Sequence, residues 1–102
     1  MTPEETLFHH VATNVEFAVA AKLFGKPCYN INGKAFCCFF ENEMVFKLDG
    51  DFHSDALSLD GTQLFDPSKK GRAMKEWVQV PADYQAVWQK LANAAARYVG
   101  RL

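Results

Sequence analysis

Hydrophobic residues recur every three or four positions at both ends of the chain, which is the spacing of a helix. At the start, Thr2 and Pro3 are suited to cap a helix, and Glu5 completes a capping box. The apolar positions that follow are Leu7, Phe8, Val11, Ala12 and Val15. A longer stripe begins at about residue 83 and runs through Tyr84, Val87, Trp88, Leu91, Ala92, Ala95 and Tyr98. The pattern predicts a helix at each end, with Gly100 past the end of the second.

Between these helices the apolar positions alternate, as they do in strands. The clearest local signal is Asn32-Gly33, which separates the apolar runs Cys28–Ile31 and Lys34–Phe40. Both turn residues tolerate positive φ, so a type I′ hairpin is predicted there. A third run, Met44–Leu48, follows a short polar loop and completes a three-stranded meander. Residues 15–24 fit both a helical stripe and a strand alternation, and no local rule decides between them.

The second half of the chain predicts shorter elements. Asp51 is suited to cap a short helix through about Leu59. A short strand at 63–66 and a loop at 67–72 follow, and then a strand at 73–80 that Pro81 stops. We therefore expect a single α+β domain spanning residues 1–102. Its antiparallel sheet has about five strands, with helices at the N- and C-terminal ends and one short helix between strands.

Both faces of the predicted hairpin at residues 29–40 carry apolar side chains. One face is expected to pack against the helices, and the other against a helix or a second subunit. A homodimer with this sheet face as its structural interface is therefore one hypothesis.

Composition narrows the function classes. Of the 102 residues, 49% are hydrophobic, which excludes a disordered chain. The net charge is -1, which argues against a strongly electrostatic binder of DNA or of anionic membranes. The start is acidic, and no apolar run approaches the ~20 residues of a membrane span. We expect a cytoplasmic protein with no membrane partner.

The three cysteines allow two interpretations. If Ile31 pairs with Lys34 across the turn, counting outward places Cys28 opposite Cys37, at the short end of disulfide geometry. These two residues are then a candidate redox pair. The favoured alternative is that they are reduced and buried, because no basic residue is placed to form a thiolate. Cys38 is expected to point to the opposite face, into the core.

No residue pattern typical of catalysis is found. The histidines His9, His10 and His53 have no nucleophile or orienting group at a suitable spacing. The acids are scattered, the glycines form no phosphate-binding motif, and no cysteine spacing fits zinc. We therefore expect a non-enzymatic protein with no cofactor and no metal site.

One cluster of positive charge stands out. Residues 67–75 carry Lys69, Lys70, Arg72 and Lys75 and no acid, and Lys34 is expected to lie behind them. A basic loop between two strands can grip phosphates, as a wing contacts a nucleic-acid backbone, and Trp77 on the next strand is placed to stack on a base. The alternative is a solvated loop beside a core tryptophan, which the near-zero net charge favours.

The middle of the chain resembles a known family. The motifs that carry the resemblance are Lys22–Tyr29, Ile31–Phe36, Val45–Leu48, Leu64–Pro67 and Gly71–Pro81, followed by the closing helix. In this order they resemble the TfoX N-terminal-like domains, which are related to the YjbR-like proteins. The resemblance covers roughly residues 21–99.

The resemblance implies a small bacterial cytoplasmic α+β domain with a strand at about residues 20–24, so the first helix should end near Asn14. The founding members regulate natural competence, and some relatives are described as DNA-binding. This implies a regulatory module that binds a protein or nucleic-acid partner. The family has no established catalytic residue to carry over. Unlike the full competence regulator, this chain has no room for a second, helical domain, which weakens the expectation of a competence role.

Overall fold

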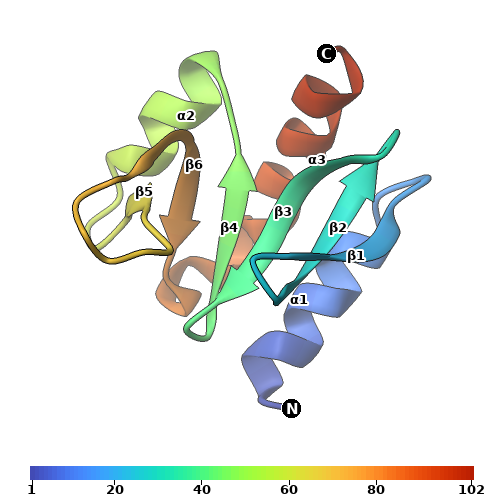
Figure 1. The fold of residues 1–102 in the computed structure, drawn as a ribbon, viewed down its shortest axis with the longest axis horizontal. Coiled ribbons are helices and arrows are strands. Elements are labelled where there is room, and N and C mark those ends of the chain that lie inside the picture. The colour runs from blue at the N-terminus through green and yellow to red at the C-terminus, as the bar shows by residue number, and fades with distance from the viewer.

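A six-stranded antiparallel sheet forms the centre of the molecule in the computed structural model, which describes all 102 residues. The strands follow the order β1-β2-β3-β4-β6-β5 across the sheet (Figure 1). Their bounds are β1 Val19–Leu23, β2 Lys26–Ile31, β3 Lys34–Phe40, β4 Glu43–Lys47, β5 Gln63–Phe65 and β6 Met74–Val80. The predicted α+β class and the meander β2-β3-β4 are confirmed, with six strands in place of about five.

Three helices cover one face of the sheet, and Figure 1 shows α1 and α3 behind the strands. They are α1 Pro3–Thr13, α2 Gly50–Leu57 and α3 Gln85–Gly100, the last preceded by a 3-10 turn, η1 Ala82–Tyr84. The Thr2 hydroxyl accepts a hydrogen bond from the Glu5 amide at 3.1 Å, as the capping box predicts. Gly100 is the last residue of α3 and not past its end, which corrects the prediction. None of the helices combines the length and apolar character that a membrane crossing requires.

Two tight turns fix the register of the first three strands. Asn32 and Gly33 have φ of 52° and 77°, which confirms the predicted hairpin turn. Phe24 and Gly25 form a second turn of the same kind between β1 and β2, with φ of 52° and 75°. The ambiguous segment 15–24 therefore ends as a strand, because this turn folds it back onto β2.

A β-bulge in the central hairpin overturns one prediction. Ile31 pairs with Lys34 as expected, but the register shifts beyond Asn30, and Cys28 lies opposite Cys38. The expected Cys28–Cys37 pair is therefore wrong. The bulge adds one residue to β3, which reverses the side-chain alternation for the rest of the strand.

The sheet has a buried core on each face. The larger core lies between the sheet and the helices and includes Phe8, Phe36, Phe46 and Trp88. The second core, on the opposite face, consists of Cys28, Cys38, Phe40, Val45, Phe65 and Trp77.

Curvature of the sheet closes this second core within one chain. The rings of Phe40 on β3 and Phe65 on β5 lie 5.1 Å apart, although three strand spacings separate these strands, about 14 Å in a flat sheet. The second core is buried without a partner, so the apolar hairpin face does not require a second subunit to cover it.

Candidate functional site at a basic corner of the sheet

The loop between β5 and β6 is wound around the carboxylate of Asp66. One carboxylate oxygen accepts hydrogen bonds from the Ser68 amide and hydroxyl, at 3.1 and 2.7 Å, and from the Lys69 amide, at 3.0 Å. The other oxygen accepts from the amides of Gly71 at 2.9 Å and Arg72 at 3.1 Å. The predicted basic loop is therefore an ordered structure with an internal anion at its centre.

These bonds lower the pKa of Asp66, the hydroxyl of Ser68 contributing most. The same hydrogen bonds determine which groups of the loop are free to bind an anion from outside the chain. A concave row of backbone amides is a common phosphate site, but here Asp66 already occupies it. Only the side chains of the loop remain available to bind an external anion.

Two lysines from distant parts of the sequence meet at the ring of Phe40. The ammonium of Lys26 lies 5.5 Å from the ring centroid and that of Lys69 lies 5.9 Å from it, within the range of cation–π attraction. Lys69 also forms an ion pair with Glu41, whereas Lys70 and Arg72 form none. We call Lys26 and Lys69, which meet at Phe40, together with Lys70 and Arg72 of the same β5–β6 loop, the basic corner.

The basic corner contains only part of the predicted set. Lys34 begins β3 and Phe40 ends it, so Lys34 lies about 20 Å from the corner along the strand, and its predicted place behind the loop is wrong. Lys75 is exposed on β6, where its carbonyl oxygen lies 2.7 Å from Nε2 of His53 on α2. Trp77 belongs to the second core and is only 7% exposed, so it is not free to stack on a base.

Lys26 is the member that sequence reasoning did not place at the site. Its position depends on the fold of β1 onto β2 and on the curvature of the sheet, and neither leaves a local signal. A hollow of about 270 Å³ adjoins the corner, lined by Phe40, Glu41, Gln63, Leu64, Asp66, Lys69 and Gln79. Within it the buried Gln79 amide donates to Glu43 at 2.8 Å.

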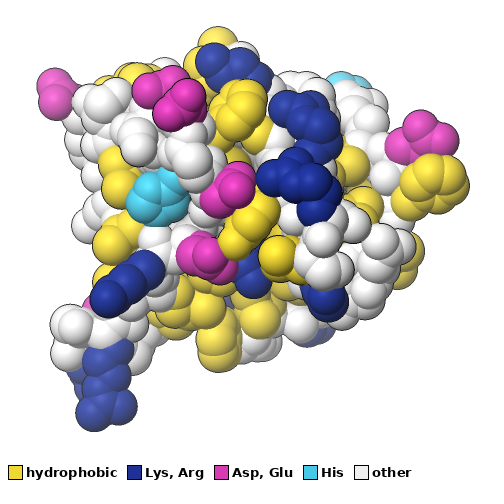
Figure 2. Space-filling model, turned by 90° about the horizontal axis from the view of Figure 1, so that it is seen from above, with side chains coloured by type: hydrophobic (Ala, Val, Ile, Leu, Met, Phe, Trp, Pro, Cys, Tyr) yellow, Lys and Arg dark blue, Asp and Glu magenta, His cyan; other side chains and the backbone are white.

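Charge elsewhere on the surface is dispersed. Figure 2 shows the Lys and Arg side chains of one face in several separate groups, with Asp and Glu side chains among them. This agrees with the net charge of -1. The basic corner is therefore a local feature and not part of a continuous positive face.

The cysteines sit in environments that suppress thiolate formation. All three are buried and free of disulfides. Burial raises the pKa of Cys28, raises that of Cys37 further and raises that of Cys38 to about 12. Cys37 belongs to the helix-side core and Cys28 to the second core, so this candidate redox pair is separated by the sheet.

A carboxylate, an imidazole and a phenol lie in a row at the α1–β2 contact. Nδ1 of His9 is 2.8 Å from the hydroxyl of Tyr29, and Nε2 of His9 is 3.5 Å from a carboxylate oxygen of Glu5. The i, i+4 spacing of Glu5 and His9 is the only part visible in the sequence. The three side chains fasten α1 to the sheet, and no hollow opens beside them. Nowhere in the chain do three His, Cys, Asp or Glu side chains gather in a way that would hold a metal.

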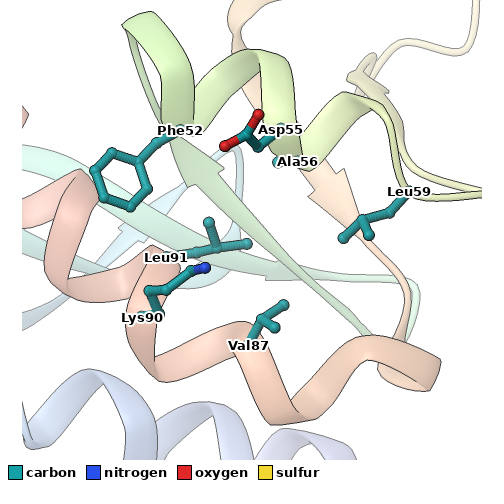
Figure 3. Close-up of a pocket in the computed structure, with 7 residues that line it drawn as sticks. All are labelled: Phe52, Asp55, Ala56, Leu59, Val87, Lys90 and Leu91. Atoms are coloured by element: carbon teal, nitrogen blue, oxygen red, sulfur yellow. The ribbon is translucent and has the colours of Figure 1, made fainter.

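An apolar groove lies between α2 and α3, and Figure 3 shows its lining. Phe52, Ala56 and Leu59 face Val87 and Leu91 across it. Its volume is about 120 Å³, well below the 300 to 1,000 Å³ or so of a small-molecule pocket. The groove is a packing seam between the helices.

The corner carries groups that bind anions. It offers the ammonium groups of Lys26 and Lys69 beside the Phe40 ring, and Lys70 and Arg72 exposed on the same loop. Comparison of the chain with protein-family models, with curated proteins and with solved structures found no match. Function is therefore inferred from the geometry of the basic corner.

Proposed function

We propose that the protein is a non-enzymatic interaction module that uses the basic corner to contact an anionic partner, specifically the phosphate backbone of a nucleic acid. The observation that carries this proposal is the Asp66-centred loop, which holds Lys70 and Arg72 outward with no ion pair in the chain. A loop that is already ordered loses little entropy on binding. Through such binding the protein would act as a regulator of transcription.

A second part of the proposal concerns the family to which the chain belongs. We infer that the chain is a TfoX N-terminal-like domain, on the motifs between Lys22 and Pro81 taken in order. The strand β1, which ends at the Phe24-Gly25 turn as the resemblance implies, supports this inference.

The number of free cations sets the expected strength of binding. Lys26, Lys70 and Arg72 have no acidic partner, whereas Lys69 is paired with Glu41. Three phosphate contacts correspond to a slope of about −2.7 in log affinity against log salt, or a loss of about 40-fold between about 50 and 200 mM salt. Binding should be weak and independent of base sequence, because contacts to phosphates carry no sequence information.

The test is fluorescence anisotropy of a labelled mixed-sequence duplex, titrated with protein at several salt concentrations. The double variant Lys70→Glu/Arg72→Glu should lose binding at low salt and keep its fold. The matched control is Lys34→Glu/Lys90→Glu, which changes the net charge equally at exposed positions outside the corner and should bind nearly as well as the parent. Equal affinities for the two double variants, or no binding by the parent at low salt, would remove the nucleic-acid proposal.

A further inference from the structure

Exposed apolar side chains gather on one edge of the sheet. Apart from the two chain ends, every large hydrophobic residue that is more than half exposed lies at residues 17–24: Phe17 at 81%, Val19 at 63% and Phe24 at 59%. This segment contains β1, which is paired on one side only. Sheet edges are usually protected by charges, proline or bulges, and β1 carries only Lys22. The opposite edge, β5, has just three residues.

The pairing of β1 with β2 determines which of its backbone groups are free. A two-residue turn makes Leu23 and Lys26 a hydrogen-bonded pair, and such pairs alternate along an antiparallel ladder. The N–H and C=O groups of Ala20 and Lys22 therefore point away from β2. They form an open row on the outer side of the edge.

This row is complementary to itself. Antiparallel pairing of two copies about a two-fold axis at Ala21 places the free groups of Ala20 against those of Lys22, giving four hydrogen bonds by symmetry. Val19 of each copy then lies opposite Leu23 of the other. An axis at Lys22 would oppose two lysines, and an axis at Ala20 would leave only residues 19–21 of the strand paired.

The apolar pairs also continue a surface that each chain already has. Ala21 and Leu23 pack against the second core, and Val19, on the same face of the strand, is 63% exposed. Pairing Val19 of one copy with Leu23 of the other extends this apolar face across the axis.

We propose that β1 is a self-association edge, through which two copies of this chain join their sheets into one continuous antiparallel sheet. The occupant of the edge is a second copy because the free hydrogen-bonding groups and the apolar pairs both match about one axis. This surface differs from the hairpin face, which a single chain already buries. The proposal goes beyond anion binding and does not depend on it.

The first test is molar mass by light scattering and sedimentation, from dilute solution to about 1 mM protein. The mass should rise from 11.5 kDa toward twice that value. Ala20→Pro removes one of the free N–H donors and should weaken the dimer at least about tenfold, since the loss occurs twice per dimer. The control Ala20→Val keeps the donor and should dimerise like the parent. Val19→Glu places a carboxylate opposite Leu23 and should also weaken the dimer, with the monomer fold unchanged because the site is exposed.

Amide hydrogen exchange of the unmodified protein gives a second readout. The amides of Ala20 and Lys22 should become protected as the concentration rises, while those of Ala21 and Leu23, which bond to β2, stay protected throughout. A monomeric mass at every concentration with concentration-independent exchange would overturn the proposal. A dimer of undiminished affinity in both Ala20→Pro and Val19→Glu would overturn it too, since the interface would then lie elsewhere.

Discussion

Burial controls the chemistry of single residues in this molecule, and the thiols show it most directly. The pKa of Cys28 and of Cys37 is raised by burial, and that of Cys38 is raised to about 12. A raised thiol pKa means that the protonated, unreactive form persists well above neutral pH. We expect none of the three thiols of the native protein to react with an aromatic disulfide reagent at pH 7–8 on the time scale of minutes, and all three to react in guanidinium.

Mild oxidation followed by mass spectrometry tests the redox alternative. Cys28 and Cys38 are opposed across the hairpin, so they are the only pair whose register allows a disulfide. After mild oxidation the intact mass should remain that of the reduced protein. A loss of two mass units traced to a peptide pair containing Cys28 and Cys38 would restore a redox-responsive role, on a different pair from the Cys28–Cys37 pair that the sequence suggested.

Among the elements, the β5–β6 loop depends on one carboxylate. Asp66→Asn keeps one acceptor oxygen but presents an NH₂ group where Oδ2 now accepts from Gly71 and Arg72. The amide N–H groups of Gly71 and Arg72 would then face another hydrogen-bond donor, the NH₂ group, and would have no acceptor. We expect the amides of Gly71 and Arg72 to lose their protection from hydrogen exchange. Asp60→Asn, at an exposed aspartate outside the loop, is the control and should leave them unchanged.

Acid should open the same loop in the unmodified protein. The pKa of Asp66 is lower in the folded chain than its ordinary value of 3.8, so its stabilisation of the loop is complete above pH 3.8. It is lost as the pH falls through the lower, folded-state pKa. The Gly71 and Arg72 amide resonances should titrate below pH 3.8, and a midpoint above that value would contradict the hydrogen-bond arrangement.

The hairpin shows how far periodicity predicts an element and where it stops. The Asn32-Gly33 turn fixed the pairing of Ile31 with Lys34 correctly, because turn geometry is local. The bulge beyond Asn30 is not local, since it lets Phe36 and Cys37 both pack on the helix-side core. Alternation cannot reveal an extra residue when both faces of a strand are apolar, as they are in β3. Counting outward from the turn therefore pairs Cys28 with Cys37, one position short of its actual partner Cys38.

At the scale of the whole molecule, curvature of the sheet creates the candidate site. It brings the Phe24-Gly25 turn and the β5–β6 loop to one ring, that of Phe40, from segments about forty residues apart. Charge counting along the sequence found Lys69, Lys70 and Arg72 but assigned Lys34 to the place that Lys26 holds. Only the three-dimensional arrangement distinguishes two lysines at opposite ends of one hairpin.

Lys26 lies close to both proposed surfaces but belongs to only one of them, and this allows the two surfaces to be separated. It begins β2, one strand inward from the β1 edge, and its ammonium lies over the Phe40 ring of β3. The side chain therefore does not reach the free backbone groups of Ala20 and Lys22. We expect Lys26→Glu to leave the molar mass at each protein concentration unchanged, whereas Ala20→Pro lowers it.

Nucleic-acid binding should respond to the same two variants in the opposite way. Lys26→Glu removes a cation from the basic corner, so duplex affinity should fall and the salt slope should become shallower by about one unit. Ala20→Pro changes no charge and should leave duplex affinity unchanged. Loss of duplex binding with an intact dimer in Lys26→Glu, and the reverse in Ala20→Pro, would establish two separate surfaces. If Ala20→Pro left the dimer intact, the free row of β1 would not be the interface, whatever the fate of the anion site.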